Sequence, residues 1–188
     1  MLPIGPLMEE HRVIEKLMPQ IRQAVEAARR EGTIDLRFVR LALDFVRIYA
    51  DRCHHGKEED ILFKALDSKP MKPEHRKIMD ELVEEHKVGR QKVRELSEAA
   101  DAYRTGGAEQ SKAALDTILD RLDFLASFYP AHIEKEDKRF FLPVMDYFDE
   151  KERTALIEAE MAFDREFVHE IYRGKLEEAA EILRAPAA

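Results

Sequence analysis

Two copies of a four-residue step from histidine to glutamate stand out among the residues that could do chemistry. His54 and Glu58 form the first copy, and His132 and Glu136 form the second. On an α-helix this spacing places the two side chains on one face, about 6 Å apart along the axis. An imidazole and a carboxylate in these positions can bind one metal ion, or the carboxylate can bridge to a second ion.

Two further histidines follow pairs of glutamates in a repeated motif. EEHRV at residues 9–13 returns as EEHKV at 84–88, and HHGKEEDILF at 54–63 returns as HIEKEDKRFF at 132–141. The EEH motifs add His11 and His86 to the candidate ligands. Both halves of the chain therefore carry the same polar residues in the same order, as two similar helix pairs would.

The repeat also indicates which of the adjacent histidines, His54 or His55, faces inward. Alignment of the two copies places His54 over His132 and Glu58 over Glu136. Steps back from His54 along a helix meet a row of apolar residues, which are Ala50, Val46, Leu43, Val39 and Leu36. We therefore predict that His54 and Glu58 face inward and that His55 lies nearer the edge of the helix.

The candidate metal ligands are thus four histidines and two glutamates: His11, His54, Glu58, His86, His132 and Glu136. Imidazole with carboxylate favours iron, manganese or zinc over calcium or magnesium, and two carboxylates suit a dinuclear site. The alternative is that these residues pair with one another or form ordinary surface salt bridges. We favour a metal site, because burial of six such groups without a cation would require a separate partner for each.

Long helices are expected to position these residues. Apolar residues recur at steps of four and three, which is typical of helices that pack in a bundle. The sequence predicts helices at about residues 6–30, 35–66, 73–104 and 109–141, joined by short connections. Short connections make neighbouring helices antiparallel. The predicted fold is all-α, with an antiparallel four-helix bundle over residues 1–145.

A helical extension is expected to follow the bundle. Residues 146–188 should form one amphipathic helix and a short last helix after Gly174, packed on or beside the bundle. Glu166 and His169 have the E-x-x-H spacing of ferritin-type ligands, but that class needs two such pairs and this segment has one. We therefore expect Glu166 and His169 on the helix surface.

Four other residues near the candidate ligands have less specific signals. His75 is about 16 Å along its helix from His86, too far to share a metal, and is expected to make a polar contact at the end of the bundle. Cys53 is expected to be packed in the core, and the alternative is a redox role. Tyr49 and Tyr129 are either outer contacts of the metal site or core residues.

The EEH and H-x-x-x-E motifs resemble those of the hemerythrin-like family, the HHE cation-binding domains. The resemblance covers about residues 6–145 and includes the aromatic residues that close each H-x-x-x-E segment. It implies a four-helix bundle with a non-haem di-iron centre, bridged by Glu58, Glu136 and an oxo or hydroxo group. Manganese or zinc could substitute for the two iron ions. The family includes oxygen carriers, oxygen and redox sensors, and proteins of iron handling or nitrosative stress.

One difference from the classical oxygen carriers bears on function. Those proteins have a second histidine one turn from the third-helix ligand, whereas Leu82 and Arg90 occupy these positions here. We therefore expect a protein that binds or senses a diatomic ligand, oxygen or nitric oxide, without durable oxygen carriage. The alternatives are an iron-handling or stress protein that acts in repair or turns over peroxide or nitric oxide, and a structural module without metal. Whether the chain is an enzyme stays open.

Composition argues against several other classes of protein. The 188 residues are 45% hydrophobic and 37% charged, which suits one core with a charged surface. A net charge of -8 with interspersed signs argues against a nucleic-acid partner, which needs clustered Lys and Arg. The single cysteine, Cys53, excludes a disulfide framework, and no segment has the roughly 18 apolar residues of a membrane span. We expect a cytoplasmic protein without a membrane partner, of unknown oligomeric state.

Overall fold

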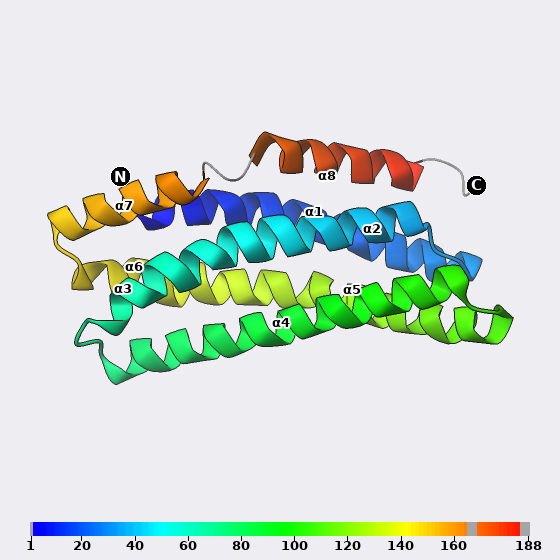
Figure 1. The fold of residues 1–188 in the computed structure, drawn as a ribbon, viewed down its shortest axis with the longest axis horizontal. Coiled ribbons are helices and arrows are strands. Elements are labelled where there is room, and N and C mark those ends of the chain that lie inside the picture. The colour runs from blue at the N-terminus through cyan, green and yellow to red at the C-terminus, as the bar shows by residue number, and fades with distance from the viewer. Residues whose placement is uncertain (1, 165–168, 185–188) are drawn as a thin grey trace.

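The computed structural model describes residues 2–164 and 169–184, and four helical rods lie side by side in it (Figure 1). The first rod is α1 (Ile4–Glu31) and the third is α4 (Pro73–Thr105). The second contains α2 (Leu36–Asp44), the π-helices η1 (Phe45–His55) and η2 (Glu58–Phe63), and α3 (Lys64–Asp67). The fourth contains α5 (Ala108–Lys135), the π-helix η3 (Glu136–Phe140) and α6 (Phe141–Val144). The predicted all-α bundle is confirmed.

The ends of the rods follow from local chemistry. Gly32 ends α1 with a left-handed backbone, at a φ of 72°, which costs glycine little. Asp35 caps the second rod, since its carboxylate accepts a hydrogen bond of 2.8 Å from the backbone N–H of Arg37. Pro73 begins α4, where a missing N–H does no harm. The predicted helix boundaries therefore lie within a few residues of the observed ones.

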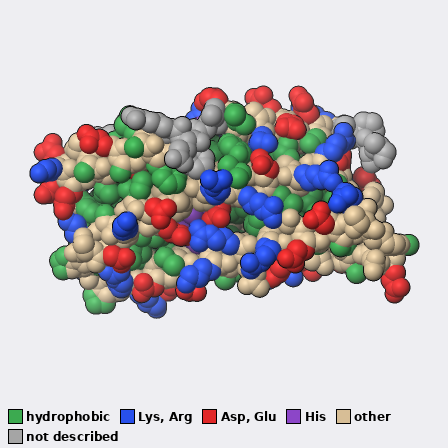
Figure 2. Space-filling view, in the orientation of Figure 1, with side chains coloured by type: hydrophobic (Ala, Val, Ile, Leu, Met, Phe, Trp, Pro, Cys, Tyr) green, Lys and Arg blue, Asp and Glu red, His purple; other side chains and the backbone are tan. Residues whose placement is uncertain are grey.

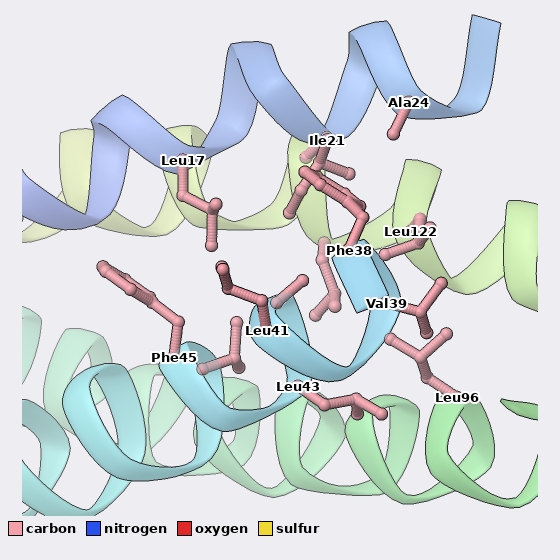
Figure 3. Close-up of a cluster of buried hydrophobic side chains, with 14 of the residues drawn as sticks. Leu17, Ile21, Ala24, Phe38, Val39, Leu41, Leu43, Phe45, Leu96 and Leu122 are labelled. Atoms are coloured by element: carbon pink, nitrogen blue, oxygen red, sulfur yellow. The ribbon is translucent and has the colours of Figure 1, made fainter. Parts of the chain in front are cut away.

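Two hydrophobic clusters fill the bundle and leave a polar layer between them. The larger cluster packs Leu17 and Ile21 of α1 against Phe38 of α2, Leu96 of α4 and Leu122 of α5, whose side chains converge in Figure 3. The smaller cluster contains Leu7, Leu62, Leu82 and Phe140 from the same four rods. On each rod, the candidate ligands lie in sequence between residues of the two clusters. The apolar packing thus brings them to one level of the bundle.

The extension packs along α1 and the second rod (Figure 1). It contains the short 3-10 helix η4 (Met145–Tyr147), α7 (Glu150–Asp164) and α8 (His169–Arg184). The predicted boundary at Gly174 is wrong, because Gly174 lies inside α8, between Tyr172 and Leu176, which both pack on the larger cluster. A single glycine is tolerated in a helix that gains such contacts. None of the described helices has the length and apolarity to cross a membrane.

Glu160 of α7 is a buried carboxyl group whose oxygens have no hydrogen-bond partner among the described residues. Burial raises its pKa from 4.5 to about 8; Lys57 opposes this shift, whereas Glu10 and Asp164 add to it. The folded protein thus keeps a proton that the unfolded chain loses above pH 4.5, so this group lowers stability progressively from pH 4.5 to about pH 8.

We expect Glu160→Gln, a neutral replacement of similar shape, to stabilise the metal-free protein at pH 8 by on the order of 3 kcal/mol. At about pH 5 the effect should be small, since the folded wild-type carboxyl is protonated there and the unfolded one is only partly ionised. Thermal unfolding of both proteins at the two pH values measures the difference. Equal unfolding temperatures at pH 8 would contradict the expectation.

Candidate metal centre

The π-helical turns of the second rod direct two adjacent histidines into the bundle. Hydrogen bonds in a π-helix join residues i and i+5, so a turn contains more residues and successive side chains diverge less than in an α-helix. His54 and His55 are only 1% and 2% exposed. The prediction that His55 lies nearer the edge is therefore wrong, because it assumed α-helical spacing along the whole second rod.

The first group of potential ligands contains His11, His54, Glu58 and Glu136, with donor atoms within 4.8 Å of one another. Nε2 of His11 lies 3.2 Å from Oε2 of Glu136, and Nε2 of His54 lies 3.5 Å from Oε1 of Glu58. All four side chains are buried. Two imidazoles and two carboxylates from three rods therefore converge on one position.

The second group contains His55, Glu58, His86 and His132, again with donor atoms within 4.8 Å of one another. Nε2 of His86 lies 3.4 Å from Oε2 of Glu58 and 3.2 Å from Nε2 of His132. Glu58 thus turns one oxygen toward each group. Glu136 does the same, since its Oε1 lies 3.2 Å from Nε2 of His132. Two glutamates between two clusters of imidazoles are the arrangement that a dinuclear site with bridging carboxylates requires.

Apart from Nε2 of His86 and of His132, which contact each other, the atoms that face this centre have no hydrogen-bond partner in the described part of the chain. They are Nε2 of His11, His54 and His55, and both oxygens of Glu58 and Glu136. Buried polar atoms in proteins are nearly always hydrogen-bonded, so a cluster of unpaired ones needs a specific explanation. Metal cations accept lone pairs from nitrogen and oxygen together. The donor set therefore fits two cations, of the kind that imidazole and carboxylate bind.

A carboxylate lies against the other ring nitrogen of each of the five histidines. The Nδ1 contacts are His11 with Asp137 at 2.8 Å, His54 with Glu10 at 3.0 Å, His55 with Asp51 at 3.4 Å, His86 with Glu59 at 2.6 Å and His132 with Glu85 at 2.7 Å. Donation from Nδ1–H leaves the Nε2 lone pair free for a metal and fixes the ring orientation. These ten residues therefore form an inner layer of potential ligands and an outer layer of carboxylates that orients them.

Protonation competes with metal binding at this centre. Burial, assisted by the neighbouring His11, lowers the pKa of His54 to about 4. Burial and the charge of Glu136 raise the pKa of Glu58. Burial also acts to raise the pKa of Glu136, but His132 and His11 outweigh it and hold that pKa low. Burial opposes protonation of His132, yet Glu136 raises its pKa to about 9. A metal must displace the protons that Glu58 and His132 retain, so metal binding should weaken in acid.

A cavity of about 150 Å³ lies between η1, α4 and α5, and His55 of the second group forms part of its wall. The rings of His55 and Tyr129 line it together with Val46, Gly89, Val93 and the charged residues Arg47, Asp51, Arg90 and Arg94. Figure 2 shows acidic and basic side chains interspersed over this face, with a small area of histidine visible among them. The cavity can admit a molecule much smaller than a metabolite, as far as His55.

The other described residues singled out in the sequence lie outside the two ligand groups. Nδ1 of His75 lies 2.8 Å from the Tyr147 hydroxyl, which confirms the polar contact at the end of the bundle. Cys53 is buried, as expected of a packed cysteine. Tyr129 stacks on His55 with ring centroids 6.3 Å apart, whereas Tyr49 stacks on Tyr172 of α8 in the core. His169 is partly exposed, and Glu166 lies outside the described residues.

The structure brings together all six predicted ligands and adds His55, which the sequence analysis had placed at the edge. The outer carboxylates were also missed, although the repeat contains their signal. Glu10 and Glu85 occupy the same place in the two EEH motifs, and Glu59 and Asp137 directly follow Glu58 and Glu136. Each acid pairs with a histidine of a neighbouring rod in the same order in both halves.

Comparison with known proteins agrees with this geometry. A family model, the hemerythrin HHE cation-binding domain, matches residues 2–144. No curated protein and no solved structure matches the chain. The matched region contains every residue of the two ligand groups and ends at α6, where the fourth rod ends. A polar layer of histidines and glutamates inside a four-helix bundle, over a segment that this family model matches, shows that the chain belongs to the hemerythrin HHE cation-binding family.

Proposed function

We propose that this protein binds two iron ions and presents them to a small diatomic ligand, oxygen or nitric oxide. When bound, the iron ions supply redox chemistry and coordination positions for such a ligand. The observation that carries the proposal is an unequal supply of nitrogen donors. His11 and His54 belong to one position, whereas His55, His86 and His132 belong to the other, and Glu58 lies between them. The position with fewer nitrogens has more room for an external ligand.

His55 changes the expectation that was drawn from the third helix. That helix has no second histidine beside His86, but His55 stacks on the His86 ring at a centroid distance of 3.9 Å and offers a nitrogen from the second rod. The missing third-helix histidine therefore no longer argues against oxygen carriage. The ring of Tyr129, stacked on His55, is an oxidisable group beside the centre and favours turnover of peroxide or nitric oxide as the second candidate function.

The cavity supports a small ligand over a large one. Its volume of about 150 Å³ corresponds to a few water molecules, and its apolar walls include Val46 and Val93. Burial of Tyr129 raises the pKa of its phenol, so the hydroxyl stays protonated at neutral pH and can donate a hydrogen bond. A diatomic molecule fits these conditions. The cavity ends at His55, which belongs to the other position, so the ligand must pass between the two groups to reach the position of His11 and His54. The cytoplasmic location expected from the sequence stays a prediction.

Exposure of the diferrous protein to oxygen, nitric oxide and azide tests the proposal. We expect each ligand to change the absorption spectrum of the iron centre, because the position of His11 and His54 leaves a place for it. An oxygenated form that survives repeated cycles would identify a carrier, and steady consumption of peroxide or nitric oxide would identify an enzyme. Failure of every ligand to perturb the spectrum would rule out the proposed function.

The variant Gly89→Leu tests, in the same experiment, whether the ligand enters through this cavity. Gly89 forms part of the wall of the cavity. The Cβ atom of a leucine at this position would lie 3.4 Å from the Phe128 ring, a contact that a small shift relieves. Leucine also suits a helix better than glycine, so the fold should tolerate it. We expect ligand association to slow by about tenfold with unchanged iron content, as measured by rapid mixing. Unchanged association rates would show that the ligand enters elsewhere.

A further inference from the structure

Lys57 is a buried lysine that joins the bundle to the C-terminal extension. Its side chain has 0% exposure, and its ammonium group donates to Oε1 of Glu10 on α1 and, at 2.7 Å, to Oδ1 of Asp164 at the end of α7. The same oxygen of Asp164 lies 3.4 Å from Nε2 of His169, the first residue of α8. A buried ammonium group needs such partners, because it has lost its water.

This contact continues to the candidate metal centre. Glu10 uses its second oxygen for Nδ1 of His54, at 3.0 Å, and His54 belongs to the first group of ligands. An unbroken series of polar contacts therefore runs from Asp164 through Lys57 and Glu10 to His54. The extension is thus connected to a metal ligand through only two intervening side chains.

The other half of the repeat has the same contacts without the extension. Lys135, the counterpart of Lys57, donates to Glu85, which holds His132. Its second partner is Glu81, so both carboxylates come from α4. Lys135 and Glu85 are 19% and 30% exposed, whereas Lys57 and Glu10 are 0% and 5% exposed. The extension therefore encloses the outer layer of one metal position and leaves that of the other in contact with solvent.

A close packing contact supports the same conclusion. Gly56 lies between the ligand His55 and Lys57, and a Cβ atom at this glycine would come within 2.9 Å of the Phe163 ring. Real Cβ atoms essentially never approach another atom so closely. The end of α7 thus packs directly on the backbone that carries the ligands, immediately before Asp164.

We propose that Asp164 is a positioning residue for the first metal position, the one formed by His11, His54, Glu58 and Glu136. It holds Lys57 against Glu10, which fixes the His54 ring, and so slows the exchange of the metal at this position relative to the other. The proposal rests on the proposed binding of two iron ions. It gives the extension a role in the metal centre that the match to residues 2–144 does not include.

Release of ferrous iron to a chelator tests the proposal, with Asp164→Asn as the variant and Glu81→Gln as its matched control. Both changes remove one carboxylate charge from a lysine that holds an outer glutamate. We expect Asp164→Asn to accelerate the loss of one ion by about tenfold, the lower end of the range for outer-layer changes. Glu81→Gln should release both ions at wild-type rates, and Asp164→Glu should restore slow release. The accelerated phase should be missing when Asp164→Asn is combined with His11→Ala, which damages the first position.

The result separates this proposal from the one it rests on. A wild-type protein that holds no iron overturns both. If the wild type holds two ions, equal release rates in wild type and Asp164→Asn overturn the role of Asp164 alone. Thermal unfolding of the metal-free variants provides the second readout. A purely structural role would lower the unfolding temperature of Asp164→Asn and accelerate both ions equally, which would also overturn the proposal.

Discussion

Anaerobic addition of ferrous iron to the metal-free protein is expected to raise its unfolding temperature by about 10 °C. Iron that binds the folded chain at a thousand times its dissociation constant stabilises it by about 4 kcal/mol. For a protein of this size, each kcal/mol shifts the unfolding temperature by roughly 2–4 °C. The gain is large because the folded protein holds unpaired donor atoms of His11, His54, His55, Glu58 and Glu136 together before any metal arrives.

The control for this experiment is magnesium at the same concentration, which prefers oxygen ligands and should shift the transition little. Elemental analysis after desalting should find about two iron ions per chain. The shift should shrink in acid, because the histidine nitrogens must lose their protons to bind metal. A protein that retains no iron after anaerobic loading, or gains no stability from it, would contradict the metal centre.

Replacement of Glu58 or Glu136 is expected to remove both ions, whereas replacement of a single histidine should weaken mainly one. Glu58 has one oxygen 3.5 Å from Nε2 of His54 and the other 3.4 Å from Nε2 of His86, so Glu58→Ala removes a donor from both positions. Glu136 spans His11 and His132 in the same way. We expect iron content near zero for Glu58→Ala and Glu136→Ala, and about one ion for His55→Ala.

Glu84→Ala is the matched control, since this exposed glutamate of the second EEH motif pairs only with Lys87 among the described residues. Its iron content should equal that of the wild type. The iron content of Glu59→Ala should lie between that of Glu84→Ala and that of Glu58→Ala. The reason is that loss of an outer partner of His86 typically reduces metal affinity by roughly 10–100-fold. Full iron content in His55→Ala would show that this buried residue is not a metal ligand.

The fold and most of the centre could be read from the sequence because both depend on periodic patterns. Apolar residues at steps of four and three define the inward face of each rod, and His11, His86 and His132 interrupt that face at one level. The position of His55 could not be read in this way, because residue types do not reveal a π-helical turn. The end of α7 was also missed, since Gly174 is a weaker local signal than the packing of α8 on the bundle.

The division of the chain at residue 145 into a bundle and a C-terminal extension stays a prediction. The family model ends at residue 144, as the sequence suggested, yet α7 and α8 pack along the bundle. Lys57 shows why the sequence alone could not reveal how closely the extension is joined to the bundle. A lysine after a histidine pair resembles a solvent-exposed residue until Asp164, more than a hundred residues later, covers it. Such long-range pairing of charges leaves no local trace in the sequence.

The π-helical turns of the second rod have a consequence for how polar centres in helical bundles can gain ligands. His55 aligns with Ile133, which is buried on the α-helical end of α5, so the two halves differ by one nitrogen at equivalent places. A bundle can therefore acquire a further donor by a single replacement at a position that already faces the interior, and a local change of helical pitch can aim it. Counts of ligands by motif spacing miss donors gained in this way. Two chains with the same H-x-x-x-E motifs can thus differ in how many sites remain free for an incoming molecule.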